Sequence, residues 1–500
     1  MKKIILLIAL SSVMTAQAGY FDSFKTSFYN AIQKITGYFN DKASGAKKRM
    51  ATIYYAWFKK TNPTTQQQVH EETKQSEVAK PIELPATHLL PVTETASTKA
   101  EEVLPQEVQQ GPEVSVERSK FFEEIMGIKE SDFKSFLTNA TQEDAKQYII
   151  PAGTDKILRL KGADGKIFRA GYFEEISIKT LRTQVAGITP SGAKGKLNII
   201  AVYDDQMENH GHEVDVGALQ ALPQYKGAVF QVASNFSGLE PKIYTQKPEL
   251  GIETYIGDKT QGPFAAISAA PGLIQRMYYA FYDVNTKPSE WRQTTERQIQ
   301  LLKDTDIPVT NGYIKINDTY FDKLTSKLED AFKDYLKETL EKIKVGFQGE
   351  VQVTFGAVTE ERKDEEIIEK HVRLNRADQI INQVYTAAID FNITNTKYSG
   401  KTKINELAKT IVKGAYEGTI LSAIAKGKKQ VVLTLIGTGS FGNPLIWITE
   451  AINAIMPDIE KHGLEVTVIV YKARKDTQTK KFITAMTDIA NATGGSVKIF

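Results

Sequence analysis

Residues 404–500 alternate between helical and strand patterns, and this alternation constrains the fold more than any other feature of the chain. Hydrophobic periodicity predicts helices at 404–425, 444–455 and 481–492, and strands at 431–436, 466–471 and 497–500. Such alternation is typical of a mostly parallel sheet with helices on both faces. We therefore expect an α/β fold with three layers, α/β/α, built on a mixed, mostly parallel sheet. In sheets of this kind ligands bind outside the carboxyl ends of the strands.

Three segments precede the expected folded domain. Two lysines, the apolar run 4–10 and small residues at 16 and 18 predict a secretory signal peptide at 1–18, and hence a secreted or periplasmic protein. Residues 19–60 carry aromatic and apolar side chains at helical spacing among lysines. They predict an amphipathic helical segment that packs on the main domain or contacts a membrane or a partner protein. Residues 61–118 combine prolines with an absence of aromatic side chains, which predicts a disordered linker.

The folded domain is expected to span residues 119–500, with a β-rich elaboration at its amino-terminal end. Asp164-Gly165 predicts the turn of a β-hairpin between strand-like segments at 157–160 and 167–169. Further along, the hydrophobic pattern predicts helices at 296–303 and 321–344.

The charge balance and the lack of cysteine exclude several functions. With 63 basic and 60 acidic residues the net charge is +3, so no overall field favours a nucleic-acid partner, and any phosphate site must be local. The absence of cysteine excludes disulfides, thiolate metal sites and cysteine nucleophiles. We expect no cofactor. We also expect no metal, because the His210–Asp215 cluster lacks a helical pair of ligands.

The segment 431–444 carries the clearest chemical signal. A strand of apolar residues leads into Gly437, Gly439 and Gly442, and a helix begins near Pro444, with Asn443 as a plausible cap. Glycines let backbone amides approach an anion, and a helix start adds partial positive charge, so this loop suits a diphosphate. The segment lacks the Gly-Lys-Ser/Thr of a P-loop and the glycine spacing of the dinucleotide fingerprint.

The same segment, Gly-Thr-Gly-Ser-Phe-Gly-Asn-Pro, resembles the second phosphate-binding loop of macrodomains, which wraps the diphosphate of ADP-ribose. Residues 227–235 resemble the macrodomain strand that ends in a ribose-contacting asparagine. Residues 258–267 occupy the place of the first glycine-rich loop and lack its consecutive glycines. From about residue 204 to about residue 455, the chain thus resembles a divergent macrodomain-like family of mostly uncharacterised proteins.

This resemblance implies a site for ADP-ribose or an ADP-ribosylated substrate. It implies that the diphosphate binds at 437–442, that the distal ribose lies near Asn235, and that Asp204 or Asp205 takes the adenine amino group. The expected ligand-binding residues are therefore Asp205, Gln231, Asn235, Thr260, Gln261, Gly262, Gly437, Gly439, Ser440, Phe441, Gly442 and Asn443. Arg276, Tyr278 and Tyr279 fit a helix core or the edge of this pocket, and Asn311-Gly312-Tyr313 is a turn within reach of its rim.

Hydrolysis of an ADP-ribosyl linkage needs a carboxylate or an activated water near the anomeric carbon. Glu240 and Asp258 are the expected catalytic candidates, because both lie close in sequence to the expected ligand-binding segments. The sequence leaves open whether the chain is an enzyme. The alternative is a non-enzymatic interaction protein that uses a macrodomain-like scaffold together with its amino-terminal helices. A third hypothesis is a phosphoesterase built on a similar sheet, and such an activity would depend on a metal.

Overall fold

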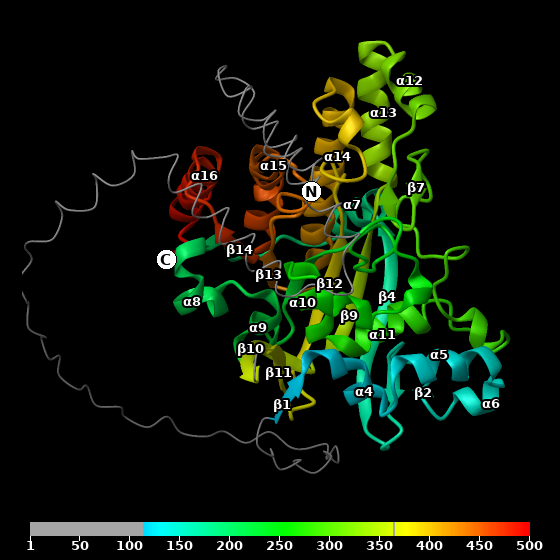
Figure 1. Ribbon diagram of the computed structural model, residues 1–500. Coiled ribbons are helices and arrows are strands. Elements are labelled where there is room, and N and C mark those ends of the chain that lie inside the picture. Colours follow the sequence, from blue (N-terminus) through cyan, green and yellow to red (C-terminus); the bar gives the residue numbers. More distant parts are fainter. Residues whose placement is uncertain (1–113, 364–365) are drawn as a thin grey trace, which may run out of the picture. The chain divides into compact units, whose positions relative to one another are not determined.

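A ten-stranded sheet forms the centre of the computed structural model, which describes residues 114–363 and 366–500 (Figure 1). The signal peptide, the amphipathic segment and the linker up to residue 113 lie outside the described residues. In spatial order the strands are β15 (Val497–Ile499), β5 (Lys196–Tyr203), β14 (Glu465–Ala473), β13 (Gln430–Leu433), β6 (Val229–Ala233), β12 (Ile380–Thr386), β9 (Lys344–Gln352), β4 (Ile167–Ser177), β3 (Leu158–Lys161) and β2 (Ile149–Ile150).

The sheet is mixed. From β15 to β12 each strand is parallel to its neighbour, and from β12 to β2 each pair is antiparallel. Side chains alternate between its faces, as they must in a pleated strand. In β5, Leu197, Ile199 and Ala201 join one core cluster, whereas Ile200 and Val202 join the other. Both faces of the sheet are therefore buried.

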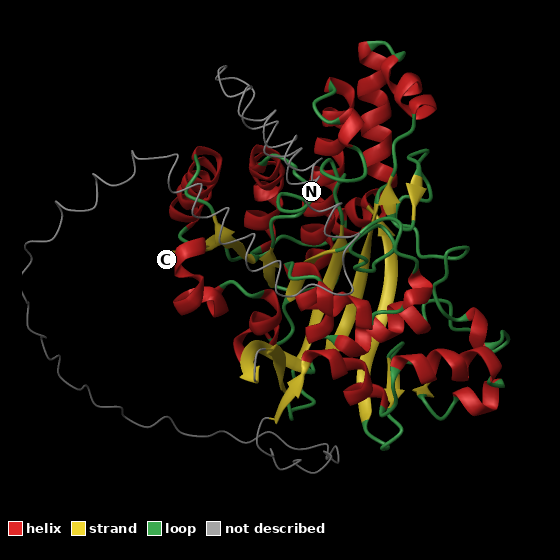
Figure 2. Cartoon of the chain, in the orientation of Figure 1, coloured by secondary structure: helices red, strands yellow, loops and turns green. Residues whose placement is uncertain are grey.

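Helices cover both faces, which confirms the expected three-layer α/β/α arrangement (Figure 2). One face packs against α7 (Ile178–Ala186), α12 (Asp318–Thr325), α13 (Glu329–Lys342), α14 (Thr402–Ala425), α15 (Leu445–His462) and α16 (Thr477–Thr493). The other packs against α8 (Met207–His210), α9 (Val216–Ala221) and α10 (Gln261–Ser268). At the antiparallel end, α4 (Phe121–Met126), α5 (Glu130–Asn139), α6 (Gln142–Ala145) and α11 (Ala270–Tyr278) share an aromatic core with β3 and β4. In the described part of the chain, no helix is both long and apolar enough to cross a membrane.

A second sheet has the strand order β1 (Val114–Glu117), β11 (Glu366–Arg373) and β10 (Phe355–Lys363). Residues 114–118 were predicted to belong to the linker, and this boundary is corrected, because β1 pairs antiparallel with β11 and buries Val116. The pairing partner lies far away in sequence, so no local pattern reveals it. A short hairpin, β7 (Val309–Thr310) and β8 (Tyr313–Ile314), turns at Asn311-Gly312.

The predicted hairpin at Asp164-Gly165 is confirmed by the pairing of β3 with β4. The predicted helix at 296–303 is wrong, because the N–H groups of Ile299 and Leu301 donate to Gln293 Oε1 and Phe236 O instead of to a helical turn. The predicted helix at 321–344 is two helices, α12 and α13, which are separated at 326–328.

Candidate functional site

Three polar loops meet at the carboxyl edge of the main sheet. They are the Glu240 loop (residues 234–241) after β6, the aspartate loop (residues 387–395) after β12, and the glycine loop (residues 437–443) after β13. Because β6 pairs in parallel with both β12 and β13, the three loops leave the sheet side by side. This is where a sheet of this type binds ligands.

Gly437 and Asn443, both in the glycine loop, determine its shape. Gly437 has φ 76°, and a Cβ there would lie 2.5 Å from the Cβ of Ala388, so only glycine fits without strain. Asn443 closes the loop: its N–H donates to Gly437 O at 2.9 Å, and its Nδ2 donates to Ile389 O at 2.8 Å. Asn443 was expected to bind ligand and to cap the next helix. Its backbone N–H and Nδ2 shape the loop, its Oδ1 is buried without a hydrogen bond to any described residue, and the N-cap of α15 is Pro444.

The aspartate loop holds the carbonyls of the glycine loop. Asn392 Nδ2 donates to Ser440 O at 2.9 Å, and Phe391 N donates to Phe441 O at 3.0 Å. The Asp390 carboxylate keeps this loop rigid by accepting bonds from the backbone N–H groups of residues 392, 393 and 394. The aspartate loop was not predicted from sequence, although Asp390 and Asn392 follow within six residues of the end of the buried strand β12.

Three consecutive amides of the glycine loop are left free. Within the described residues, the N–H groups of Gly439, Ser440 and Phe441 donate to no protein atom. Gly439 and Ser440 are exposed, and a Cβ at Gly439 would meet no atom within 4 Å. Consecutive free N–H groups just before a long helix form an anion-binding concavity. The loop can therefore accept a phosphate.

The Glu240 loop is rigid because other segments hold its carbonyl groups. The donors are Leu301 N to Phe236 O at 2.9 Å, Gln293 Nε2 to Ser237 O at 3.1 Å, Arg276 Nε to Gly238 O at 3.0 Å and Tyr313 Oη to Pro241 O at 2.5 Å. Arg276 is fully buried, with its guanidinium over the ring of Tyr385 at 3.6 Å. Arg276 was expected to lie either in a helix core or at the edge of the ligand pocket, and the structure places it in the core.

Glu240 itself has no such partner. The residue is 7% exposed, and its Oε1 is buried without a hydrogen bond to any described residue. Its Oε2 lies against Gly262, where a Cβ would stand 2.6 Å away. Burial raises the pKa of Glu240 well above its ordinary value; Arg276 opposes this rise and Asp258 adds to it. A buried, unpartnered carboxyl group in a rigid loop is typical of a functional residue rather than a structural one.

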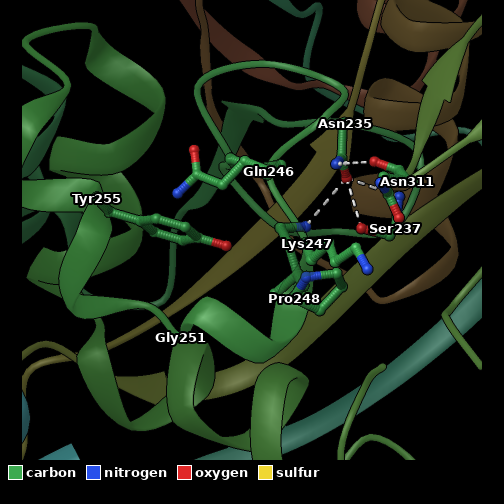
Figure 3. Close-up of a pocket in the computed structure, with 10 residues that line it drawn as sticks. Asn235, Ser237, Gln246, Lys247, Pro248, Gly251, Tyr255 and Asn311 are labelled. Carbon is green, nitrogen blue, oxygen red and sulfur yellow. Dashed lines mark hydrogen bonds between the residues drawn. The ribbon is translucent and has the colours of Figure 1, made fainter. Parts of the chain in front are cut away.

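Asn235 belongs to the same loop as Glu240, and its side chain forms hydrogen bonds within and next to this loop. Its Oδ1 accepts from Ser237 N and Ser237 Oγ, and its Nδ2 donates to Asn311 O at 2.9 Å (Figure 3). The adjoining cavity has a volume of about 10 Å³, which is room for one water molecule. It is lined by Asn235, Ser237, Leu239, Pro241, Gln246, Lys247, Pro248, Gly251, Tyr255 and Asn311. This cavity is too small for a nucleotide.

Gln231 was expected among the ligand-binding residues, and this expectation is corrected. Its side chain is fully buried between β6, β13 and α14. Its Nε2 donates to Ala415 O and Thr419 Oγ1, and its Oε1 accepts from Thr434 N. Gln231 therefore links the sheet to helix α14 and does not face the carboxyl edge of the sheet.

The facing loop (residues 258–262) precedes and begins α10. Thr260 is exposed and its N–H donates to Asp258 Oδ1 at 2.8 Å, while Gln261 Oε1 accepts from Val216 N at 2.7 Å. Gly262 touches the carboxyl end of β6, since a Cβ there would be 2.4 Å from Ala233 O. The structure thus brings Gly262 and Glu240 together, whereas Gln261 serves as an anchor to α9.

Asp205 follows β5, which lies two strands away from β13. It is exposed and accepts a bond from Lys475 Nζ at 2.7 Å, which lowers the pKa of Asp205. The described residues show no contact between Asp205 and the glycine loop.

Tyr313 joins the two halves of the site. Its hydroxyl donates to Pro241 O beside Glu240, and its ring centroid lies 5.8 Å from that of Phe441 in the glycine loop. One tyrosine side chain therefore contacts both the Glu240 loop and the glycine loop. The Asn-Gly turn before it was the sequence signal for this position.

No group of three His, Cys, Asp or Glu side chains suited to a metal ion occurs in the part of the chain that the structure describes.

Comparison with known proteins yields structural similarity alone. No protein-family model matches the sequence, and no curated protein matches it significantly. The chain is similar to poly(ADP-ribose) glycohydrolase from Thermomonospora curvata, with 10% identity, coverage of 71% of this chain and 99% of that chain, and a TM-score of 0.31. It is also similar to poly(ADP-ribose) glycohydrolase from Deinococcus radiodurans in complex with ADP-ribose, with 10% identity, coverage of 63% and 95%, and a TM-score of 0.33.

Proposed function

We propose that the glycine loop binds the diphosphate of ADP-ribose or of a related nucleotide diphosphate. The observation that carries this proposal is the set of three free, consecutive amides at Gly439, Ser440 and Phe441, next to the start of the 18-residue helix α15. A charge-assisted hydrogen bond contributes about 1.5–3 kcal/mol, and a helix start adds about 0.3–1 kcal/mol for an anion. The resemblance of residues 437–444 to a macrodomain phosphate loop supports the same ligand.

We further propose that Glu240 acts on the ribosyl linkage of such a ligand. In this reaction the oxygen of water bonds to the anomeric carbon, and the bond from that carbon to the leaving oxygen breaks. Glu240, protonated because burial raises its pKa, gives its proton to the leaving oxygen. A proton from the attacking water then restores the acid. Tyr313 supports this assignment, because it fixes Pro241, next to Glu240, relative to the glycine loop.

Calorimetric titration of ADP-ribose into the intact chain tests the binding site. Gly439→Glu places a carboxylate among the free amides, at a position where a Cβ meets no atom within 4 Å, so the fold tolerates it. We expect binding to weaken by about 100-fold or more, which corresponds to about 2.8 kcal/mol.

The matched control is Gly192→Glu. A Cβ at Gly192 also meets no atom within 4 Å, and Gly192 precedes β5 at the opposite edge of the sheet. This control should bind like the wild-type chain. Equal weakening in both variants, or no binding by the wild-type chain, would contradict the proposed site. The second result would favour the alternative of an interaction protein on this scaffold.

Export of the chain is proposed from the sequence pattern of residues 1–18. Fractionation of the producing cells with amino-terminal sequencing of the exported form tests it, and a full-length chain retained in the cytoplasm would contradict it.

A further inference from the structure

Arg118 contacts the facing loop from outside the main sheet. It begins the short helix η2 (Arg118–Lys120), directly after β1, and is 1% exposed. Its Nη1 donates to Ile256 O at 3.0 Å, and its Nη2 donates to Asp258 O at 3.3 Å. The same Nη1 pairs with Glu369 at 2.9 Å. One guanidinium group thus binds two backbone carbonyls at the start of the facing loop.

The far side of the facing loop is also held by Arg118. The guanidinium carbon lies 4.1 Å from the ring centroid of Phe264, which belongs to the first turn of α10. Arg118 therefore holds residues 256–264 at both ends, by hydrogen bonds to the carbonyl groups of Ile256 and Asp258 and by a cation–π contact with Phe264. Because the guanidinium fork is planar and rigid, these contacts fix the position of the segment and not only its charge.

The strap that carries Arg118, residues 114–120, is itself anchored to β11. Its strand β1 pairs with β11 from Val114 to Glu117, and Figure 1 shows β1 beside β11. Glu369 of β11 also pairs with Lys259 of the facing loop. The strap and β11 thus both contact the segment that contains the facing loop.

Burial of this arginine is costly. Desolvation lowers the pKa of Arg118 to about 10, although Asp258 and Asp215 oppose the change. A buried cation of this kind contributes little stability compared with an apolar side chain of similar volume. The cost indicates a role in positioning, which an apolar residue could not supply.

We infer that Arg118 is a positioning residue, which fixes residues 256–264 so that Gly262 stays against Glu240 in the ligand site. The ligand part of this inference rests on the proposed function. The side-chain contacts of Arg118 with described residues lie at residues 256–264 and Glu369 and include none with the glycine loop, so we expect it to affect the ribose side of the ligand and not the diphosphate side. Its loss should therefore discriminate between ADP-ribose and ADP, whereas a general loss of stability would not.

The experiment uses Arg118→Met in the intact chain. Methionine keeps the apolar part of the side chain, and Glu369 retains Lys259 as a partner. Arg118→Lys keeps the charge and removes the fork. The matched control is Arg373→Met, which breaks the ion pair of β11 with Glu124 at 2.7 Å, also beside the strap. Hydrogen–deuterium exchange of residues 256–264 is measured without ligand, and ADP-ribose and ADP are titrated into each variant.

We expect the amides of residues 256–264 to exchange at least about 10-fold faster in Arg118→Met, and about as fast as wild type in Arg373→Met. In Arg118→Met the affinity for ADP-ribose should fall by about 10-fold relative to wild type, whereas the affinity for ADP should stay within about two-fold of the wild-type value. Arg118→Lys should show the same pattern. Unchanged exchange in residues 256–264, or equal losses for both ligands, would overturn the inference. If the wild-type chain binds neither ligand, the proposed function fails, and the exchange measurement still decides whether Arg118 positions this segment.

Discussion

Replacing Glu240 with glutamine tests whether its carboxyl group is protonated in the folded chain. Burial raises the pKa of Glu240 well above its ordinary value of 4.5. Between the unfolded pKa and the folded pKa, the folded chain binds the proton and the unfolded chain has released it. The stability of the wild-type chain must therefore fall as pH rises through this window. Below the unfolded pKa both states hold the proton, so the carboxyl group has no pH-dependent effect there.

The size of the effect follows from proton linkage. Each pH unit inside the window lowers the free energy of unfolding by at most about 1.4 kcal/mol for one titrating group. Glu240→Gln replaces the carboxyl group with a neutral amide of similar shape, which removes this slope. The Oε1 of Glu240 has no hydrogen-bond partner among the described residues, so the substitution breaks no hydrogen bond to that atom.

The assay is urea unfolding of both chains at intervals from about pH 5 to about pH 8. Asp215 also has a raised pKa because of burial, and the difference between the two chains cancels its contribution. We expect Glu240→Gln to gain stability relative to wild type as pH rises. If wild type instead gains relative to the variant, Glu240 is ionised and paired with Arg276, and its role as a proton donor is refuted.

Two further predictions separate residues that shape the site from residues that face the ligand. Gly437→Ala should cost about 2–5 kcal/mol of unfolding free energy, because it adds a strained left-handed residue and a Cβ 2.5 Å from that of Ala388. Gly439→Ala should change stability by less than about 0.5 kcal/mol in the same urea assay, and equal effects would contradict our description of the loop. Gln231→Leu should cost about 1–3 kcal/mol, because Thr434 N–H loses its buried acceptor, while calorimetry finds the ADP-ribose affinity of the folded chain unchanged. A large loss of affinity without a loss of stability would restore Gln231 to the ligand site.

Local sequence patterns predicted the elements well where local forces dominate. The order from α14 to β15 follows the hydrophobic periodicity of residues 404–500, because each element buries the face that its pattern marks. The pattern placed the end of α15 near Ile455, yet the helix continues through Pro457 to His462. At 296–303, tertiary hydrogen bonds replaced the helix that the pattern predicted.

The candidate site was predicted in part. The glycine loop and Glu240 were identified from sequence, since glycine spacing and an acid after a strand are local signals. Gln231 and Asn443 are polar residues in the expected segments, and only their burial shows that they hold the fold together. Arg118 lies at the end of the segment that was predicted to be a linker, and nothing local marks its contact with residues 256–258.

The sequence by itself determined the α/β class, the carboxyl-edge position of the candidate site and the glycines of the loop that borders it. These follow from periodicity and backbone freedom, which are properties of neighbouring residues. Only the tertiary structure decided which amides stay free, which carboxyl group loses its partners and which arginine holds the facing loop. Those properties depend on desolvation and on hydrogen bonds between residues more than a hundred positions apart, as between Arg118 and Asp258, and such contacts exist only in the folded chain.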